Sequence, residues 1–241
     1  MNMAIFRLDK YLAEVGIGSR SDVKNIIKAG KIKVDGVCVK KADTKINTDT
    51  AIVTYNDNPL VYEKYVYFML NKPKGVVSAT EDKVDKTVID IITEAKHMNL
   101  FPVGRLDKDT EGLLIITNDG ELAHNLLSPK KHVCKKYYVE LDEEVTEEKA
   151  SKLTNGIELD DFVTMPAQID HTDDNKKVYI TIMEGKFHQV KRMFKAVGCN
   201  VLYLKRVSMG KLKLDEKLKQ GEYRRLTNDE LALLKENQND N

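Results

Sequence analysis

The chain has 241 residues, of which 41% are hydrophobic and 32% charged, and its net charge at pH 7 is +1. This composition is typical of a globular protein, which excludes a largely disordered chain, and the length is sufficient for two domains, each with its own core. Because no apolar run approaches ~18 residues, no signal-peptide core is present and the three cysteines form no CxxC pair, we expect a cytoplasmic protein with reduced thiols, no membrane span and no zinc site.

The first 45 residues form a basic segment. They contain ten basic and five acidic residues, a local net charge of +5 within the total of +1, which leaves −4 for the rest of the chain. The stretch RLDKYLAEVG has apolar residues at helical spacing, and GSRSDVKNIIKAG predicts a second helix with Ser19 or Ser21 as its N-cap. The next stretch, KIKVDGVCVKK, alternates apolar and polar residues on both sides of Asp35-Gly36, which predicts a β-hairpin with a two-residue turn.

Basic side chains follow one side of the second predicted helix. At ~100° per residue they fall within an arc of roughly 80°, and they are Arg20, Lys24, Lys28 and Lys31. A neighbouring apolar arc can face a core. Such a basic stripe is typical of phosphate binding, although a solvated helix face could carry the same charges.

The order helix, helix, hairpin resembles the S4 RNA-binding domain over about residues 4–50. The resemblance is carried by RLDKYL, by the Ser-Arg that opens the second helix, by the Ile, Lys and Gly at its end, and by IKVDG. It implies that this segment binds RNA through shape and backbone. The implied RNA-binding residues are Arg7, Lys10, Arg20, Lys24, Lys28 and Lys31. We expect an S4-like domain over residues 1–60, including a short linker that begins near residue 54, and a second domain over residues 61–241.

The second part of the chain contains strand and helix patterns that do not alternate strictly. Strands are predicted at YVYFMLNK, LLIIT, KYYVEL, FVTMPAQI and KVYITIM, and helices at ELAHNLL, TEEKASKL, QVKRMFKAV and NDELALLK. This order favours an α+β fold, with a largely antiparallel mixed sheet flanked by helices, over a doubly wound fold.

Several common catalytic motifs are absent from the sequence. It has no GxxxxGK[ST] phosphate loop, no GxGxxG after a strand, no HExxH and no GxSxG, and none of its five histidines are paired at metal-ligand spacing. We therefore expect neither a metal nor a cofactor.

The stretch GRLDKDTEGLLIITNDG, residues 104–120, places a carboxylate among basic side chains. Asn118-Asp119-Gly120 predicts a turn that delimits a strand at 113–117, so Asp107 lies in the loop that enters this strand. An oriented, ionised carboxylate can act as a nucleophile or base without a cofactor. An R-x-D pair can also be a simple salt bridge in a loop.

The longer stretch FPVGRLDKDTEGLLIITNDGELAHNLLSP resembles the signature of the RsuA-type pseudouridine synthases, in which the Asp of GRLD is the catalytic residue. Three further family blocks are matched by LNKPKGVVSA (residues 70–79), KKYYVEL (135–141) and EGKFHQVKRMFKAVGCNVLYLKRVSMG (184–210). The resemblance spans essentially the whole chain, including the S4 segment. It departs at Phe187-His188, where many relatives carry other polar residues, and we assign nothing catalytic to these two positions.

The resemblance implies that the protein isomerises uridine to pseudouridine in ribosomal RNA after flipping the base out of its stack. Asp107 would be the catalytic residue, and Arg105 would pair with it or hold the flipped nucleotide. Tyr137 would stack on the uracil and could take the C5 proton, and Lys191 would balance the carboxylate. Without the resemblance, Tyr137 could equally be a packed strand residue and Lys191 a solvated helix residue. The residues leave open whether Asp107 attacks C6, attacks C1′ or removes a ribose proton.

The favoured substrate is 16S rRNA in an assembly intermediate. LLSPKKHVCKKYYVEL looks closer to the small-subunit enzymes than to the large-subunit enzymes, and the chain lacks long charged extensions. The alternatives are a 23S rRNA pseudouridine synthase of the same superfamily and a non-catalytic, S4-type ribosome-assembly factor. We expect a monomer that binds no membrane.

Overall fold

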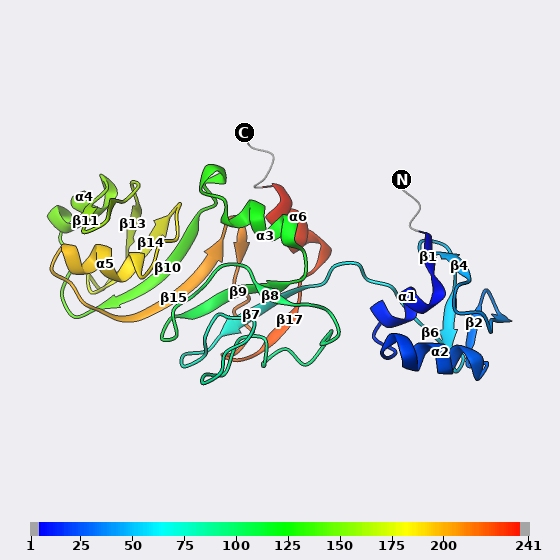
Figure 1. Cartoon of the computed structure of the whole chain (residues 1–241). Coiled ribbons are helices and arrows are strands. Elements are labelled where there is room, and N and C mark those ends of the chain that lie inside the picture. Colours follow the sequence, from blue (N-terminus) through cyan, green and yellow to red (C-terminus); the bar gives the residue numbers. More distant parts are fainter. Residues whose placement is uncertain (1–4, 237–241) are drawn as a thin grey trace. The chain divides into compact units, whose positions relative to one another are not determined.

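The helix signals near the N-terminus produce two helices that pack on short strands. The computed structural model describes residues 5–236, and the chain divides into two units, the first of which runs to Val66 and includes Glu94–Asn99 (Figure 1). The second unit comprises Tyr67–Thr93 and the chain from Leu100 onward. The outermost ends of the two predicted domains, residues 1–4 and 237–241, lie outside the described residues.

The first unit combines two helices with two small sheets. Its helices are α1 (Leu8–Glu14) and α2 (Arg20–Lys28). Its strands are β1 (Ile5–Arg7), β2 (Ile32–Val34), β3 (Val37–Cys38), β4 (Lys45–Asn47), β5 (Val53–Tyr55) and β6 (Asn58–Pro59). β1 pairs with β4, and the other strands form a sheet in the order β3-β2-β5-β6. Apolar side chains from both helices, such as Leu12 and Ile27, are fully buried against these strands.

Local sequence signals determine where helix α2 begins and where the hairpins of this unit turn. Ser19 is the N-cap of α2, where it forms a capping box with Asp22. Asp35 and Gly36 have φ values of 50° and 80°, as a two-residue turn between β2 and β3 requires. The prediction of a linker that begins near residue 54 is wrong at its start, because Asn56 and Asp57 also have positive φ values and close a second hairpin, β5–β6.

The second unit is built on one nine-stranded sheet with the main order β13-β14-β10-β15-β9-β7-β17. β8 pairs with β9 and β16 with β15 at its margins. The strands are β7 (Tyr67–Lys72), β8 (Phe101–Pro102), β9 (Glu111–Thr117), β10 (Lys135–Leu141), β13 (Gln168–His171), β14 (Lys177–Ile182), β15 (Val201–Met209), β16 (Leu212–Lys213) and β17 (Tyr223–Arg225). A separate hairpin is formed by β11 (Glu158–Leu159) and β12 (Phe162–Val163).

The pairing of β15 with β9 is parallel, whereas the other described strand pairs of this sheet are antiparallel. The register matches Lys205 with Glu111 and Arg206 with Gly112. The sheet is therefore mixed and largely antiparallel, and the predicted α+β fold is confirmed.

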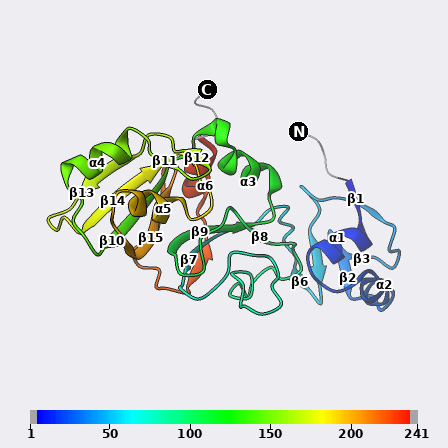
Figure 2. The same ribbon diagram turned by 60° about the vertical axis from the view of Figure 1, so that its left-hand side comes forward.

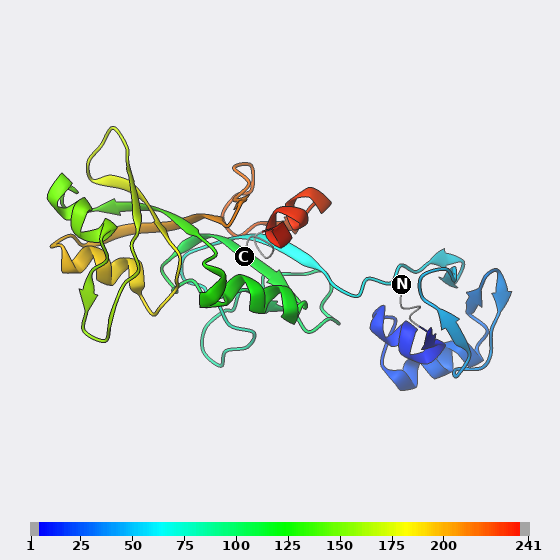
Figure 3. The ribbon, with the colours of Figure 1, turned by 90° about the horizontal axis from the view of Figure 1, so that it is seen from above.

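Two pairs of helices lie at opposite ends of the sheet. They are α3 (Gly120–Leu127), α4 (Glu147–Thr154), α5 (Gln189–Ala196) and α6 (Asn228–Glu236), with a short 3₁₀ turn, η1, at Pro129–Lys131. α3 and α6 pack with apolar residues of β7 and β9 in one core cluster. Figures 2 and 3 show α4 and α5 at the opposite end of the sheet. No helix within residues 5–236 has the length and apolar content needed to cross a bilayer.

Two strand predictions differ from the structure. The stretch FVTMPAQI is not one strand, because it divides between β12 and β13 around Pro166. The nine-residue strand β15 was not among the predicted strands, although it lies between β10 and β9 in the sheet. β15 combines exposed apolar residues such as Leu202 with the buried Arg206, so its sequence lacks a regular alternation.

Candidate active site

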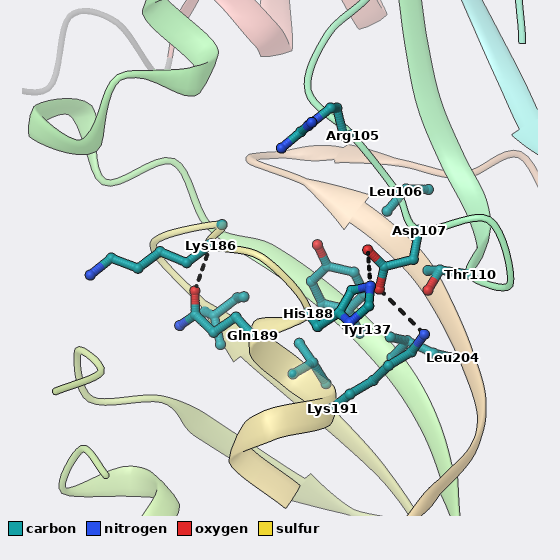
Figure 4. Close-up of a pocket in the computed structure, with 13 residues that line it drawn as sticks. Arg105, Leu106, Asp107, Thr110, Tyr137, Lys186, His188, Gln189, Lys191 and Leu204 are labelled. Atoms are coloured by element: carbon teal, nitrogen blue, oxygen red, sulfur yellow. Dashed lines mark hydrogen bonds and ion pairs between the residues drawn. The ribbon is translucent and has the colours of Figure 1, made fainter. Parts of the chain in front are cut away.

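Asp107 lies in the loop between β8 and β9, at the edge of a pocket in the second unit (Figure 4). Its side chain is 25% exposed, so the carboxylate is reachable from solvent but mostly enclosed. The pocket is lined from three directions, by the Asp107 loop, by β10 and β15, and by the start of α5. A base entering this pocket would therefore meet the carboxylate at its rim.

A buried lysine at the end of β7 binds the backbone of the Asp107 loop. Lys72 is fully buried, and its Nζ atom donates hydrogen bonds of 2.9 Å to the carbonyl oxygens of Asp107 and Thr110. Longer bonds reach the carbonyls of Pro73 at 3.2 Å and Lys108 at 3.4 Å. Burial lowers the pKa of Lys72 to about 8, and the neighbouring carboxylate of Asp107 opposes this effect. The ammonium group thus gathers the backbone oxygens of the loop around one point.

The segment after β7 supports the same loop. The Oγ atom of Ser78, which is 9% exposed, donates to the carbonyl of Leu106 at 2.8 Å and accepts from the Leu106 amide at 3.1 Å. The amide of Gly75 donates to the carbonyl of Lys108 at 2.7 Å. Both neighbours of Asp107 in the chain are therefore fixed by backbone contacts, which limits the movement of the carboxylate.

Helix α5 brings a cation to the carboxylate. The Nζ atom of Lys191 lies 3.3 Å from Oδ2 of Asp107 and also donates a hydrogen bond to Asp109. Burial raises the pKa of Asp109, but the hydrogen bond and charge of Lys191 outweigh burial, so this pKa lies below its usual value. Asp109 is more than half exposed and shares Lys191 with Asp107.

His188 contacts Asp107 as well, although the sequence analysis assigned nothing to it. Its Nε2 atom lies 3.6 Å from Oδ1 of Asp107. His188 is the N-cap of α5, has a left-handed φ value of 49° and lines the pocket. The two oxygens of the Asp107 carboxylate thus face different partners, Lys191 and His188.

Tyr137 forms part of the pocket wall. It lies on β10, next to β15, where Leu204 lines the same pocket. The residue is 7% exposed, and its hydroxyl makes no hydrogen bond to any residue between 5 and 236. A packed aromatic ring with an unoccupied hydroxyl can stack on a base and still exchange a proton.

Arg105 lies at the pocket rim but does not pair with Asp107. Figure 4 shows its side chain extending away from the carboxylate, and within the described chain no ion pair joins the two residues. The pairing with Asp107, one of the two roles that the resemblance implies for Arg105, is not formed within the described chain, where the carboxylate instead faces Lys191 and His188. The second expectation, that Arg105 holds the nucleotide, remains a prediction.

The basic residues of the first unit divide into two groups. The stripe on α2 and just after it is exposed, and it consists of Arg20, Lys24, Lys28 and Lys31. Arg7 and Lys10 instead lie near acids of their own unit, since Arg7 pairs with Asp9 at 2.8 Å and Lys10 lies 3.6 Å from Glu14. The hydrogen bond with Asp9 raises the pKa of Arg7. The stripe is thus the more available surface for phosphate groups.

Comparison with known proteins identifies relatives along nearly the whole chain. A family model for the S4 domain matches residues 6–52, and a family model described as RNA pseudouridylate synthase matches residues 66–196. An uncharacterized RNA pseudouridine synthase of Bacillus subtilis is 51% identical, with 96% of this chain and 99% of the relative covered. Ribosomal small subunit pseudouridine synthase A of Yersinia pestis is 40% identical, with 94% and 97% covered. A crystal structure of a pseudouridylate synthase is 38% identical, with a TM-score of 0.67 and coverage of 95% and 99%.

Proposed function

Because the chain belongs to the RNA pseudouridine synthase family, in the RsuA-type branch with an N-terminal S4 domain, we propose that it converts a uridine of 16S rRNA to pseudouridine and that Asp107 is its catalytic carboxylate. The observation that carries this proposal is the position of Asp107, which is held at a pocket rim between Lys191 and His188 on a loop anchored by Lys72.

The reaction makes and breaks bonds within one nucleotide. The C1′–N1 bond breaks, the uracil turns within the pocket, and a C1′–C5 bond forms, while C5 loses its proton and N1 gains one. The target base must first leave its stack. The pocket then retains the detached uracil, and the fixed carboxylate acts on the nucleotide by attack at C6, by attack at C1′ or by removing a ribose proton.

The neighbouring side chains have separate roles in this proposal. Lys191 balances the charge of Asp107 at 3.3 Å and keeps the carboxylate oriented. Tyr137 stacks on the uracil, and its free hydroxyl takes the C5 proton in the last step. Arg105, exposed at the rim, holds the phosphate or ribose of the flipped nucleotide.

The first unit serves to position the RNA. Its exposed stripe on α2 neutralises backbone phosphates and adds affinity that depends on salt but not on sequence. In this proposal the RNA-binding domain comprises residues 1–60 and the catalytic domain residues 61–241. The protein acts as a monomer in the cytoplasm, where ribosomal subunits are assembled.

The choice of 16S rRNA is supported by relatives that are named as ribosomal small subunit enzymes, including that of Yersinia pestis at 40% identity. Two other functions remain as outcomes of the test. A 23S rRNA enzyme would modify the large-subunit transcript instead, and a non-catalytic assembly factor would bind RNA without forming pseudouridine.

The decisive experiment measures tritium release from transcripts labelled at uracil C5. Asp107→Asn preserves the shape of the side chain and removes its charge, so we expect product formation to fall by more than about 10³-fold with RNA affinity nearly unchanged. Asp109→Asn is the matched control, since it makes the same change two residues away on the same lysine, and it should retain activity within about tenfold. Product formation by Asp107→Asn within about tenfold of wild type would refute the role of Asp107.

The substrate is determined by mapping pseudouridines in both ribosomal RNAs from cells with and without the gene. Loss of one 16S pseudouridine is the expected result. Loss of a 23S pseudouridine would show that the substrate is large-subunit rRNA. An unchanged map together with inactive wild-type protein would favour the assembly factor.

A further inference from the structure

Two aromatic rings form a step at the mouth of the pocket. The rings of Phe187 and His188 are stacked with centroids 3.8 Å apart and an angle of 19° between their planes. His188 lines the pocket and contacts Asp107, whereas the Phe187 residue is 69% exposed. The step therefore runs from the carboxylate to the outside of the pocket.

The turn that carries the step is held rigidly. Gln189, which is 3% exposed, accepts a hydrogen bond from the amide of Lys186 at 3.0 Å and donates to Glu184 at 2.8 Å. Glu184 also accepts from the amide of Met165 at 2.8 Å. These bonds fix the left-handed backbone at His188, so Phe187 is presented to solvent in a set orientation. A single exposed apolar residue needs no explanation, but a rigid ring stacked on a pocket residue is prepared for a planar ligand.

Positive charges border the step. The ammonium group of Lys186 lies 3.5 Å from the ring centroid of Phe162, and Lys186 also lines the pocket. Lys191, three residues after His188, and Arg105 also line the pocket. Planar rings interleaved with cations are the features by which proteins hold unpaired RNA bases and their phosphates.

We propose that a base next to the target uridine stacks on the exposed face of Phe187 while the uridine occupies the pocket. This inference rests on the proposed function. Flipping a nucleotide removes the stacking partner of each neighbouring base, and the Phe187–His188 step offers a replacement surface beside the carboxylate. Phe187 is thus an RNA-binding residue that acts on affinity rather than on bond making.

The first test separates KM from kcat on an unmodified 16S transcript labelled at uracil C5. Phe187→Ala should raise KM by about 5- to 150-fold, equivalent to ~1–3 kcal/mol of stacking, and leave kcat within about threefold. Phe187→Tyr keeps the ring and should behave as wild type. Leu202→Ala is the matched control, because Leu202 is 68% exposed in the same unit and does not line the pocket.

A normal KM for Phe187→Ala would overturn the inference, as would a loss confined to kcat. A wild-type protein that forms no pseudouridine in 16S or 23S transcripts would overturn the proposed function itself. The two failures are therefore distinguishable.

The second test removes the base instead of the ring. Once the modified uridine is mapped, synthetic hairpins with an abasic site directly before or after it are bound to the full chain. Wild-type protein should lose about 5- to 150-fold in affinity at one of the two positions, and Phe187→Ala should lose less than about threefold there. Equal losses for both proteins, or no loss at either position, would overturn the inference.

Discussion

Lys72 provides the sharpest prediction, because it touches the Asp107 loop without lining the pocket. Lys72→Met keeps the length of the side chain and removes the ammonium group. We expect kcat to fall by about 10²-fold, because a displacement of about 1 Å at the reacting group has an effect of this size. RNA affinity should stay within about threefold, since Lys72 is fully buried and cannot reach a nucleic acid.

The variant should still fold. The two 2.9 Å bonds from a charged donor are worth ~1.5–3 kcal/mol each. Against this loss, the gap between the ordinary pKa of 10.5 and the value of about 8 corresponds to ~3 kcal/mol of unfavourable burial that methionine avoids. The net destabilisation is then ~0–3 kcal/mol, which a two-unit protein of this size withstands.

The pH dependence gives an independent measurement. Because the pKa of Lys72 is about 8 in the folded chain and 10.5 when unfolded, the unfolded chain binds more protons between these values. The contribution of Lys72 to stability therefore rises across this window, while activity falls as the ammonium group loses its proton above pH ~8. In Lys72→Met both effects should be absent.

Steady-state kinetics from pH 6 to 10, with chemical unfolding over the same range, tests this reasoning. Lys135→Met is a suitable control, because burial also lowers the pKa of Lys135 to about 8 but its hydrogen bond goes to Val133 at 2.7 Å. Lys135→Met should likewise lose part of the rise in stability between pH ~8 and 10.5. Its rate should fall by less than about tenfold. A kcat for Lys72→Met within about threefold of wild type, or an unaltered alkaline limb, would refute the positioning role of Lys72.

Two further predictions concern RNA binding and the pocket wall. Reversing the charge of the stripe residues Arg20, Lys24 and Lys28 to Glu should weaken RNA binding and flatten its dependence on salt, with turnover of a short hairpin retained at saturation; an unchanged slope in a filter-binding titration would argue against phosphate contacts. Tyr137→Phe should preserve binding but lose about 10²–10⁴-fold in turnover, and Tyr137→Leu should lose both; normal turnover of the Phe variant would exclude the hydroxyl as base.

Local signals were sufficient for elements whose conformation is decided by adjacent residues. The N-cap of α2 and the turn at Asp35-Gly36 follow from side chains one to three positions apart. β15 could not be found in this way, because contacts with β9 and β10 stabilise it and bury Arg206 against the carbonyl of Leu113. The RsuA-type resemblance and the fold class are confirmed by the comparisons. Both were predictable because they rest on motifs distributed over the whole chain.

The candidate site was predictable in part for the same reason. Asp107 stands in a motif of adjacent residues, whereas the role of Lys72 depends on acceptors up to 38 positions away. A lysine directly before a proline, at the end of a largely apolar strand, was the available signal for this contact. His188 gave less indication, because its approach to Asp107 depends on a left-handed backbone that Gln189 and Glu184 hold in place.

The parallel pairing of β9 with β15 determines how wide the pocket can be. The loop with Asp107 leads into β9, and the wall with Leu204 belongs to β15, so the gap between carboxylate and wall depends on how closely these strands approach. At the contact, Gly112 has a φ of +100°, and a Cβ atom there would lie 2.2 Å from the carbonyl oxygen of Arg206. Even one methyl group at this position would force the strands apart and move Asp107 away from the opposite wall of the pocket. The position of the Asp107 carboxylate, which we propose to be catalytic, thus depends on the absence of a side chain at Gly112 on the strand that follows it.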